Sequence, residues 1–68
     1  MTVAVVPGSF DPPTLGHVDV IARAVEVFDR VLIAVVANPS KTPLFSSAER
    51  TQMLEEICAD WENTDIDA

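Results

Sequence analysis

Residues 7–17 read Pro-Gly-Ser-Phe-Asp-Pro-Pro-Thr-Leu-Gly-His and follow directly on an apolar run, Thr-Val-Ala-Val-Val, at residues 2–6. The run is short and β-branched, which is typical of a strand buried on both faces of a parallel sheet. The stretch after it predicts a tight loop and the start of a helix, where backbone N–H groups and the helix dipole favour an anion. Gly8 would let the backbone approach a ligand closely or adopt a positive φ. Gly16 places no side chain on the first turn of the helix.

The residues beyond this loop predict a β-α-β-α order followed by the start of a third strand. Apolar residues recur at helical spacing over residues 14–28, and residues 30–37 form a second continuous apolar strand. Ser46 and Glu49 have the spacing of a capping box, which opens a second helix that should end near residues 61–62. The apolar positions of the two helices are Leu15, Val18, Ile21, Ala22, Val25 and Phe28 in the first, and Met53, Leu54, Ile57, Cys58 and Trp61 in the second.

The connections predict how these elements form layers. Parallel strands added in one direction place both crossover helices on the same face of the sheet. The second face of the first two strands is also apolar, and residues 1–68 hold nothing that would cover it. We therefore expect an α/β fold that is the first half of a doubly wound parallel sheet. The open face should be hidden by self-association or by a further segment.

Composition and charge exclude several classes of function. Residues 1–54 hold five acidic and four basic side chains, whereas residues 55–68 hold six acidic side chains and no basic one. No basic patch exists, so nucleic acid is not expected as a partner. The longest apolar run, residues 31–37, is too short to span a membrane, and the N-terminus lacks the pattern of a signal peptide. The single cysteine, Cys58, fits a reducing, cytoplasmic location and a buried thiol.

Each polar residue near the first loop has a structural and a functional interpretation. His17 could be a surface or capping residue, but its place beside a strand end favours an imidazole that faces a ligand. Ser9 could bond to loop backbone, Asp11 could brace the turn, and Thr14 is best explained as the N-cap of the helix. Lys41 could be a solvated lysine, but its loop leaves the same sheet edge, where ligands bind in open α/β sheets.

Two blocks of sequence resemble a known enzyme family. Pro-Gly-Ser-Phe-Asp-Pro followed by Thr-x-Gly-His resembles the signature of nucleotidyltransferases that carry an (H/T)xGH motif. Asn-Pro-Ser-Lys-Thr-Pro-Leu-Phe at residues 38–45, followed by Ala-Glu-Arg, resembles bacterial phosphopantetheine adenylyltransferases within that group. The resemblance covers all 68 residues. It implies a Rossmann-like fold, of which residues 1–68 are the N-terminal half, and transfer of adenylyl from ATP to 4′-phosphopantetheine. The products would be dephospho-coenzyme A and pyrophosphate, with Mg²⁺ carried by the nucleotide.

The resemblance also implies roles for individual residues. Ser9 would contact the phosphopantetheine phosphate and, with Phe10, ATP. His17 would hold the ATP phosphates and stabilise the transition state, and Lys41 would bind and orient the phosphopantetheine phosphate as the second catalytic residue. Structural support of the loop would come from Gly8, Asp11, Thr14 and Gly16. No metal site held by the protein itself is expected.

The length of the chain limits what these residues should do alone. Members of the family are much longer and usually form homo-oligomers, as hexamers, so residues 1–68 should be inactive by themselves. A nicotinate mononucleotide adenylyltransferase usually has two glycines before the Ser/Thr-Phe-Asp-Pro block and a histidine at the position of Thr14. Three alternatives therefore remain. They are an enzyme of that type, a cytidylyltransferase-like enzyme, and a non-catalytic half-domain that binds an anion or self-associates.

Overall fold

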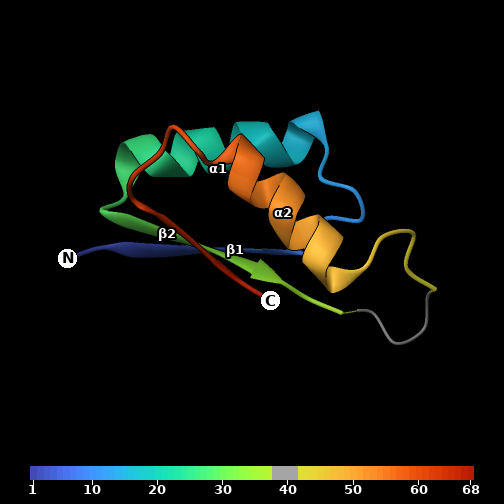
Figure 1. Cartoon of the computed structure of the whole chain (residues 1–68). Helices are drawn as coiled ribbons and strands as arrows, with labels where there is room; N and C mark the ends of the chain where they lie inside the picture. The colour runs from blue at the N-terminus through green and yellow to red at the C-terminus, as the bar shows by residue number, and fades with distance from the viewer. Residues whose placement is uncertain (38–41) are drawn as a thin grey trace.

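The computed structural model describes residues 1–37 and 42–68, which form a parallel sheet with helices between its strands (Figure 1). The described elements are β1 (Val3–Gly8), α1 (Leu15–Val27), β2 (Arg30–Val35), α2 (Ser47–Ile57) and β3 (Thr64–Asp67). This order confirms the predicted α/β class, including the third strand. Neither of the two helices in the described part of the chain is long and apolar enough to cross a lipid bilayer.

The three strands run parallel in the order β1-β2-β3, so that β2 lies between its neighbours. The register places Val6 beside Ile33, and Ile33 beside Ile66. Both α1 and α2 lie on the same side of this sheet (Figure 1). The predicted layering is therefore confirmed, and the arrangement is that of a Rossmann-like α/β fold.

The hydrophobic core fills the space between the sheet and the two helices. Its buried members are Phe10, Ile21, Val31, Ile33, Leu54 and Cys58. The apolar stripe predicted for α1 is correct in the middle of the helix, where Ile21 is fully buried, but wrong at its ends. Leu15 is 87% exposed and Phe28 is 38% exposed. Helical spacing identifies the face that packs, but the extent of the sheet beneath decides which turns are covered.

The strands differ from their predicted bounds at the edge where the site forms. Strand β1 continues to Gly8 rather than ending at residue 6, and β2 ends at Val35 rather than at residue 37. Pro7 lies inside β1, in register with Ala34. A proline is tolerated there because β1 is at the edge of the described sheet, where a missing N–H donor leaves no partner unpaired.

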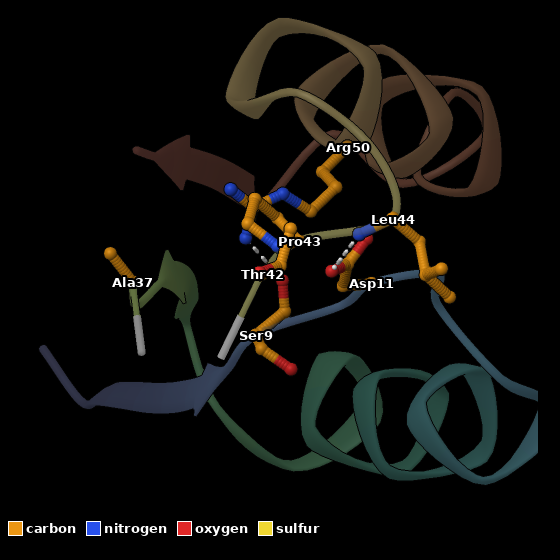
Figure 2. A pocket seen from close by; sticks show the side chains of 7 residues that line it. All are labelled: Ser9, Asp11, Ala37, Thr42, Pro43, Leu44 and Arg50. Carbon is orange, nitrogen blue, oxygen red and sulfur yellow. Dashed lines mark hydrogen bonds between the residues drawn. The ribbon is translucent and has the colours of Figure 1, made fainter. Parts of the chain in front are cut away.

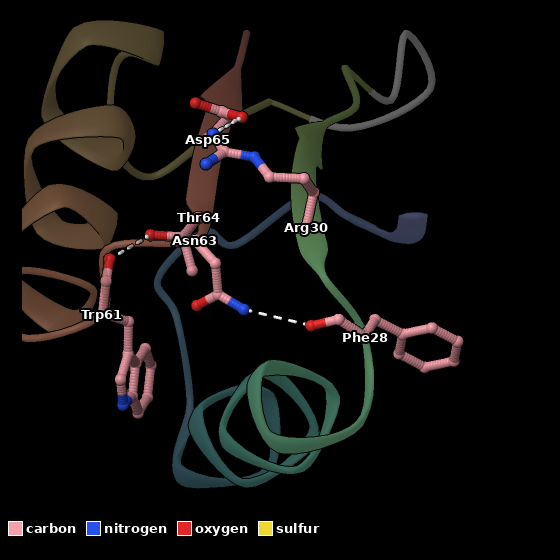
Figure 3. A network of polar contacts seen from close by, with 6 residues as sticks. All are labelled: Phe28, Arg30, Trp61, Asn63, Thr64 and Asp65. Atoms are coloured by element: carbon pink, nitrogen blue, oxygen red, sulfur yellow. Dashed lines mark hydrogen bonds and ion pairs between the residues drawn. The ribbon is translucent and has the colours of Figure 1, made fainter. Parts of the chain in front are cut away.

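Helix α2 is shorter than the sequence predicted. It ends at Ile57, with Cys58 as its C-cap, and does not extend to Trp61. The backbone N–H of Trp61 donates to the carbonyl of Cys58, and the Thr64 hydroxyl donates to the carbonyl of Trp61 (Figure 3). The chain must turn here because Val31 of β2 already donates its N–H to the Asn63 carbonyl. Trp61 still packs against the core, but from this turn.

The second face of the sheet is apolar and open, as the sequence predicted. Val3 and Val5 of β1 are 55% and 58% exposed, so β1 is not buried on both faces within residues 1–68. Leu32 lies between Val5 and Asp65 in the same row of the sheet. Asp65 pairs there with Arg30 of β2 (Figure 3). Apart from Arg30, the open face is thus hydrophobic over β1 and β2, and it is acidic over β3.

The Asn63 side chain joins the end of α1 to the beginning of β3. Its amide nitrogen donates to the carbonyl of Val25 at 3.2 Å. It also donates to the carbonyl of Phe28 at 3.2 Å, as Figure 3 shows. The last carbonyls of a helix have no partner within the helix. Asn63 supplies that partner, and it holds the C-terminal end of α1 at the height where β3 enters the sheet.

We expect Asn63→Ala to lower the free energy of unfolding by about 1–3 kcal/mol, because two hydrogen bonds are lost. Asn63→Asp should cost more, since a carboxylate cannot donate and its charge opposes the negative end of the helix dipole. Urea denaturation of each variant measures the change. The exposed amide of Gln52 on α2 supplies the matched control, Gln52→Ala. An equal effect of Asn63→Ala and Gln52→Ala would contradict the role of Asn63.

Candidate functional site

The loop after β1 is built around the side chain of Phe10. This residue has a φ of 51°, and its ring is wholly buried in the core. A Cβ at position 8 would lie 3.1 Å from Cζ of Phe10, a tighter contact than side chains usually make, so the ring would have to shift to admit one. Of the two alternatives predicted for Gly8, the positive φ is wrong, because the left-handed backbone conformation falls on Phe10 and not on Gly8. The close approach to a ligand stays a prediction. Gly8, the last residue of β1, leaves space for the Phe10 ring.

Asp11 ties the first loop to the loop that precedes α2. Its two carboxylate oxygens accept the backbone N–H groups of Leu44 and Phe45, both at 2.8 Å. Two loops that are far apart in sequence are thereby joined at the carboxyl ends of β1 and β2. The predicted bracing role of Asp11 thus extends beyond its own turn.

His17 is part of the cap of α1. Thr14 is the N-cap, as predicted, and its hydroxyl accepts the His17 N–H at 3.3 Å. In return, Nδ1 of His17 accepts the Thr14 N–H at 3.0 Å. This reciprocal capping box uses histidine where glutamate or glutamine is usual, so the ordinary sequence pattern of a capping box does not indicate it. With Nδ1 as the acceptor, a neutral ring carries its proton on Nε2.

The aromatic ring of Phe10 also contacts the imidazole. The centroids of the two rings are 4.7 Å apart, and the ring planes are inclined by 59°. His17 is therefore held on one side by the backbone and hydroxyl of Thr14 and on another by a buried aromatic ring. At Gly16, an added Cβ would meet only Thr14 Oγ1, at 3.6 Å, which is an ordinary contact.

A pocket of about 380 Å³ lies beside this loop (Figure 2). The residues that line it are Ser9, Asp11, Ala37, Thr42, Pro43, Leu44 and Arg50. Arg50 comes from α2 and is only 7% exposed. One guanidinium nitrogen donates to the Ser9 carbonyl at 3.0 Å, and Nε donates to the Ser46 carbonyl at 3.3 Å. Arg50 belongs to the second family block, but the sequence does not predict its role, because no local pattern indicates burial of an arginine.

The predicted site residues thus fall into two groups. Ser9, Phe10, Asp11 and His17 lie on the loop after β1 or on the first turn of α1, at one edge of the sheet. Lys41 lies outside the described residues, so its predicted role stays a prediction. Thr42 and Ala37, which flank the undescribed stretch, both line the pocket. The described residues contain no group of three or more side chains that could hold a metal ion.

Cys58 lies outside the site, and its thiol is expected to be unreactive. It is buried at the end of α2, and burial raises the pKa of its thiol, with a smaller opposing effect of a hydrogen bond to Thr64. A thiol with a raised pKa holds little reactive thiolate at neutral pH. This agrees with the predicted structural role of Cys58.

We expect Asp11→Asn to loosen the contact between the two loops, because an amide has one acceptor oxygen where the carboxylate uses two. Hydrogen exchange at the Leu44 and Phe45 amides should become faster, while exchange in β2 should change little. Asp19→Asn, at an exposed position of α1 that pairs with Arg23, is the matched control. Unchanged exchange at both loop amides in Asp11→Asn would contradict the bridge.

The capping box of α2 predicts a dependence of stability on pH. Hydrogen bonds from the Ser46 N–H and then from the Ser46 hydroxyl lower the pKa of Glu49 from its ordinary value of 4.5. The stabilisation is therefore fully present above the unfolded pKa and lost as the pH falls through the folded pKa. Glu49→Gln should flatten this acidic part of the stability profile, measured by urea denaturation at a series of pH values. Glu55→Gln, at an exposed position on the same helix, should leave its shape unchanged.

Comparisons with known proteins agree with this geometry. The cytidylyltransferase-like family matches residues 5–67. A phosphopantetheine adenylyltransferase of Natranaerobius thermophilus is 54% identical over 67 residues, which cover 98% of this chain and 41% of the relative. The enzyme of that name from Carboxydothermus hydrogenoformans is 52% identical over 100% of this chain and 42% of its own length. The phosphopantetheine adenylyltransferase of Caldanaerobacter subterraneus subsp. tengcongensis is 49% identical over 98% of this chain and 42% of its own length.

The chain spans about two fifths of the length of the curated relatives it matches. Within that span, the relatives confirm the resemblance to phosphopantetheine adenylyltransferases that the two sequence blocks indicated. The family match, the parallel β-α-β-α-β arrangement and the loop at the edge of the sheet agree, and the chain belongs to the cytidylyltransferase-like family.

Proposed function

We propose that residues 1–68 form the N-terminal, phosphate-binding part of a phosphopantetheine adenylyltransferase. The observation that carries the proposal is the position of His17. It stands in the first turn of α1, held by Thr14 and Phe10, at the carboxyl edge of a parallel sheet. Relatives at about 50% identity that carry this enzyme's name support the choice of substrates, ATP and 4′-phosphopantetheine.

The reaction needs positioning and charge neutralisation rather than proton transfer. A phosphate oxygen of 4′-phosphopantetheine attacks the α-phosphorus of ATP, and the bond from that phosphorus to the bridging oxygen of pyrophosphate breaks. Because the nucleophile is already an anion, no general base is required. The protein has to align two polyanions and to offer donors to the charge that develops on the reacting phosphoryl group.

The residues of the first loop suit these tasks. His17 has Nδ1 engaged by the Thr14 N–H, so Nε2–H is the donor that remains for an ATP phosphate. Ser9 is exposed beside the pocket and offers a hydroxyl and a backbone N–H to either substrate. The Phe10 side chain is buried, which leaves its backbone as the part that would contact ATP. In this proposal, the Lys41 ammonium binds and orients the phosphate of 4′-phosphopantetheine.

Mg²⁺ belongs to the proposal as an ion that the nucleotide carries. Asp11 is the carboxylate that lines the described pocket, and both of its oxygens already accept backbone N–H groups. Mg²⁺ commonly keeps several waters and binds substrate phosphates with few protein ligands. When bound, it would neutralise phosphate charge, while the residues of this chain orient the reacting groups.

The remaining parts of the proposal concern the whole enzyme. The open apolar face of β1 and β2 would be covered in the active enzyme by the rest of the domain, and residues 1–68 alone would not turn over substrate. A homo-oligomer, a hexamer by family resemblance, and a reducing cytoplasmic setting go with this function. The buried Cys58 thiol suits such a setting.

The choice of substrate is tested by pyrophosphate release in a full-length enzyme that carries these residues. With ATP, 4′-phosphopantetheine should support turnover and nicotinate mononucleotide should not. With CTP, phosphocholine should be inactive. Turnover with either of the other two acceptors alone would replace the proposal by a related nucleotidyltransferase. If none of the three supports turnover, these residues are a non-catalytic module.

The role of His17 has a separate test in the same full-length enzyme. His17→Ala should lower kcat by about 100- to 1,000-fold, the usual effect of losing one donor to a transition state. The KM values for both substrates should change far less, because the contact strengthens as charge develops. Asp19→Ala, two residues along the same helix, is the control. A rise in KM with kcat unchanged would make His17 a binding residue only.

A further inference from the structure

Arg50 is a buried cation with no acidic partner among the described residues. Its two acceptors are the backbone carbonyls of Ser9 and Ser46, and no carboxylate of the described chain lies within ion-pair distance. Burying a charged group costs free energy unless hydrogen bonds compensate. A leucine or methionine would fill this position of α2 at a lower cost. The guanidinium therefore contributes something other than packing.

The contact with Ser9 acts on the peptide that determines the Phe10 conformation. The Ser9 carbonyl and the Phe10 nitrogen belong to one planar peptide unit. Anchoring the carbonyl oxygen at 3.0 Å fixes the orientation of that unit, which favours the φ of 51° at Phe10. Such a conformation is unfavourable for a residue with a Cβ and persists where surrounding contacts impose it. Figure 2 shows the Arg50 side chain reaching from α2 toward the loop that holds Ser9.

The same contact reaches His17 through the Phe10 ring. The ring is wholly buried, passes over Gly8, and lies 4.7 Å from the imidazole between centroids. If the peptide before Phe10 rotates, the ring cannot keep this place, and the imidazole loses one of the two contacts that orient it. Arg50, Ser9, Phe10 and His17 thus form one continuous series of contacts from α2 to the first turn of α1.

We propose that Arg50 is a positioning residue for nucleotidyl transfer, and that it acts through the Ser9 carbonyl and the Phe10 ring on the orientation of His17. This proposal rests on the proposed function, because it assigns Arg50 to the same reaction. Arg50 also lines the pocket, so direct binding of a substrate phosphate is the competing role. The two roles differ in the kinetic constant that they change.

The test compares Arg50→Met and Arg50→Lys in a full-length enzyme that carries these residues. Methionine keeps the apolar stem and removes the bridge, whereas lysine keeps the charge but lacks the guanidinium fork that reaches two carbonyls. We expect kcat to fall by about 10- to 100-fold in both, since misplacing a catalytic group by about 1 Å has effects of this size. The KM values should stay close to those of the parent enzyme. Arg23→Met, at an exposed arginine on α1, is the matched control and should change neither constant.

A second measurement does not depend on activity. The NMR shift of the His17 Cε1 proton reports its position relative to the Phe10 ring. It should move in Arg50→Met and stay in place in Arg23→Met. If the parent enzyme shows no adenylyl transfer, the proposed function fails, but this shift still tests the series of contacts. An unchanged shift in a folded Arg50→Met variant overturns the proposal.

The kinetic outcomes separate the two roles. A raised KM for either substrate with unchanged kcat makes Arg50 a binding residue and overturns the positioning role. Full activity of Arg50→Lys does the same, because charge alone would then suffice. Should Arg50→Met fail to fold, Gly8→Ala tests the other end of the series, since its Cβ would lie 3.1 Å from the Phe10 ring. Gly8→Ala must lower kcat and move the His17 shift, and a folded variant that does neither overturns the proposal.

Discussion

The Phe10 side chain leaves the end of β1 with a left-handed backbone and turns into the core. Its ring is one of the large side chains that fill the space between sheet and helices, and it is also in contact with His17. One residue thus belongs both to the hydrophobic core and to the edge of the sheet where polar groups gather. Its neighbours follow from this position. A Cβ at Gly8 would crowd the ring, and Arg50 holds the carbonyl of the residue before Phe10.

This arrangement bears on catalysis because the proposed reaction depends on geometry. A donor that stabilises a reacting phosphoryl group must already point at it, since reorganisation during the reaction costs free energy. A histidine on a mobile loop would meet this demand poorly. Here the imidazole is fixed by a helix cap and by a ring that the core immobilises. Packing of the Phe10 ring in the core thus also helps to orient the His17 imidazole.

The connection between the two loops follows a similar principle. Parallel strands bring their carboxyl ends to one edge, but the loops beyond them still need to be held together. Asp11 does so by accepting two backbone N–H groups from the other loop. Arg50 adds a second link, from α2 to the first loop. Both links use backbone groups on one side, so they constrain the course of the chain and not merely a pair of side chains.

The sequence alone predicted a large share of the fold. Apolar periodicity identified the strands and helices, because burial of one face is a local property of spacing. Thr14 and Ser46 identified the helix starts, because caps are formed within a few residues. The strand-loop-helix pattern of the first residues and the two family blocks together indicated the loop and the sheet edge of the candidate site. The exposed Leu15 and the early end of α2 were missed, because they depend on how far the sheet extends and where β3 must begin.

The tertiary structure decided how the site residues are held. The positive φ of Phe10, the burial of Arg50 and the bridge made by Asp11 all join residues that are distant in sequence. Ser9 and Arg50 are 41 positions apart, and no local spacing encodes such a contact. The sequence by itself thus determined which residues form the loop and on which side of the sheet the helices lie. Only packing decided which contacts orient them, because those contacts exist when α2 and the first loop meet over the same core.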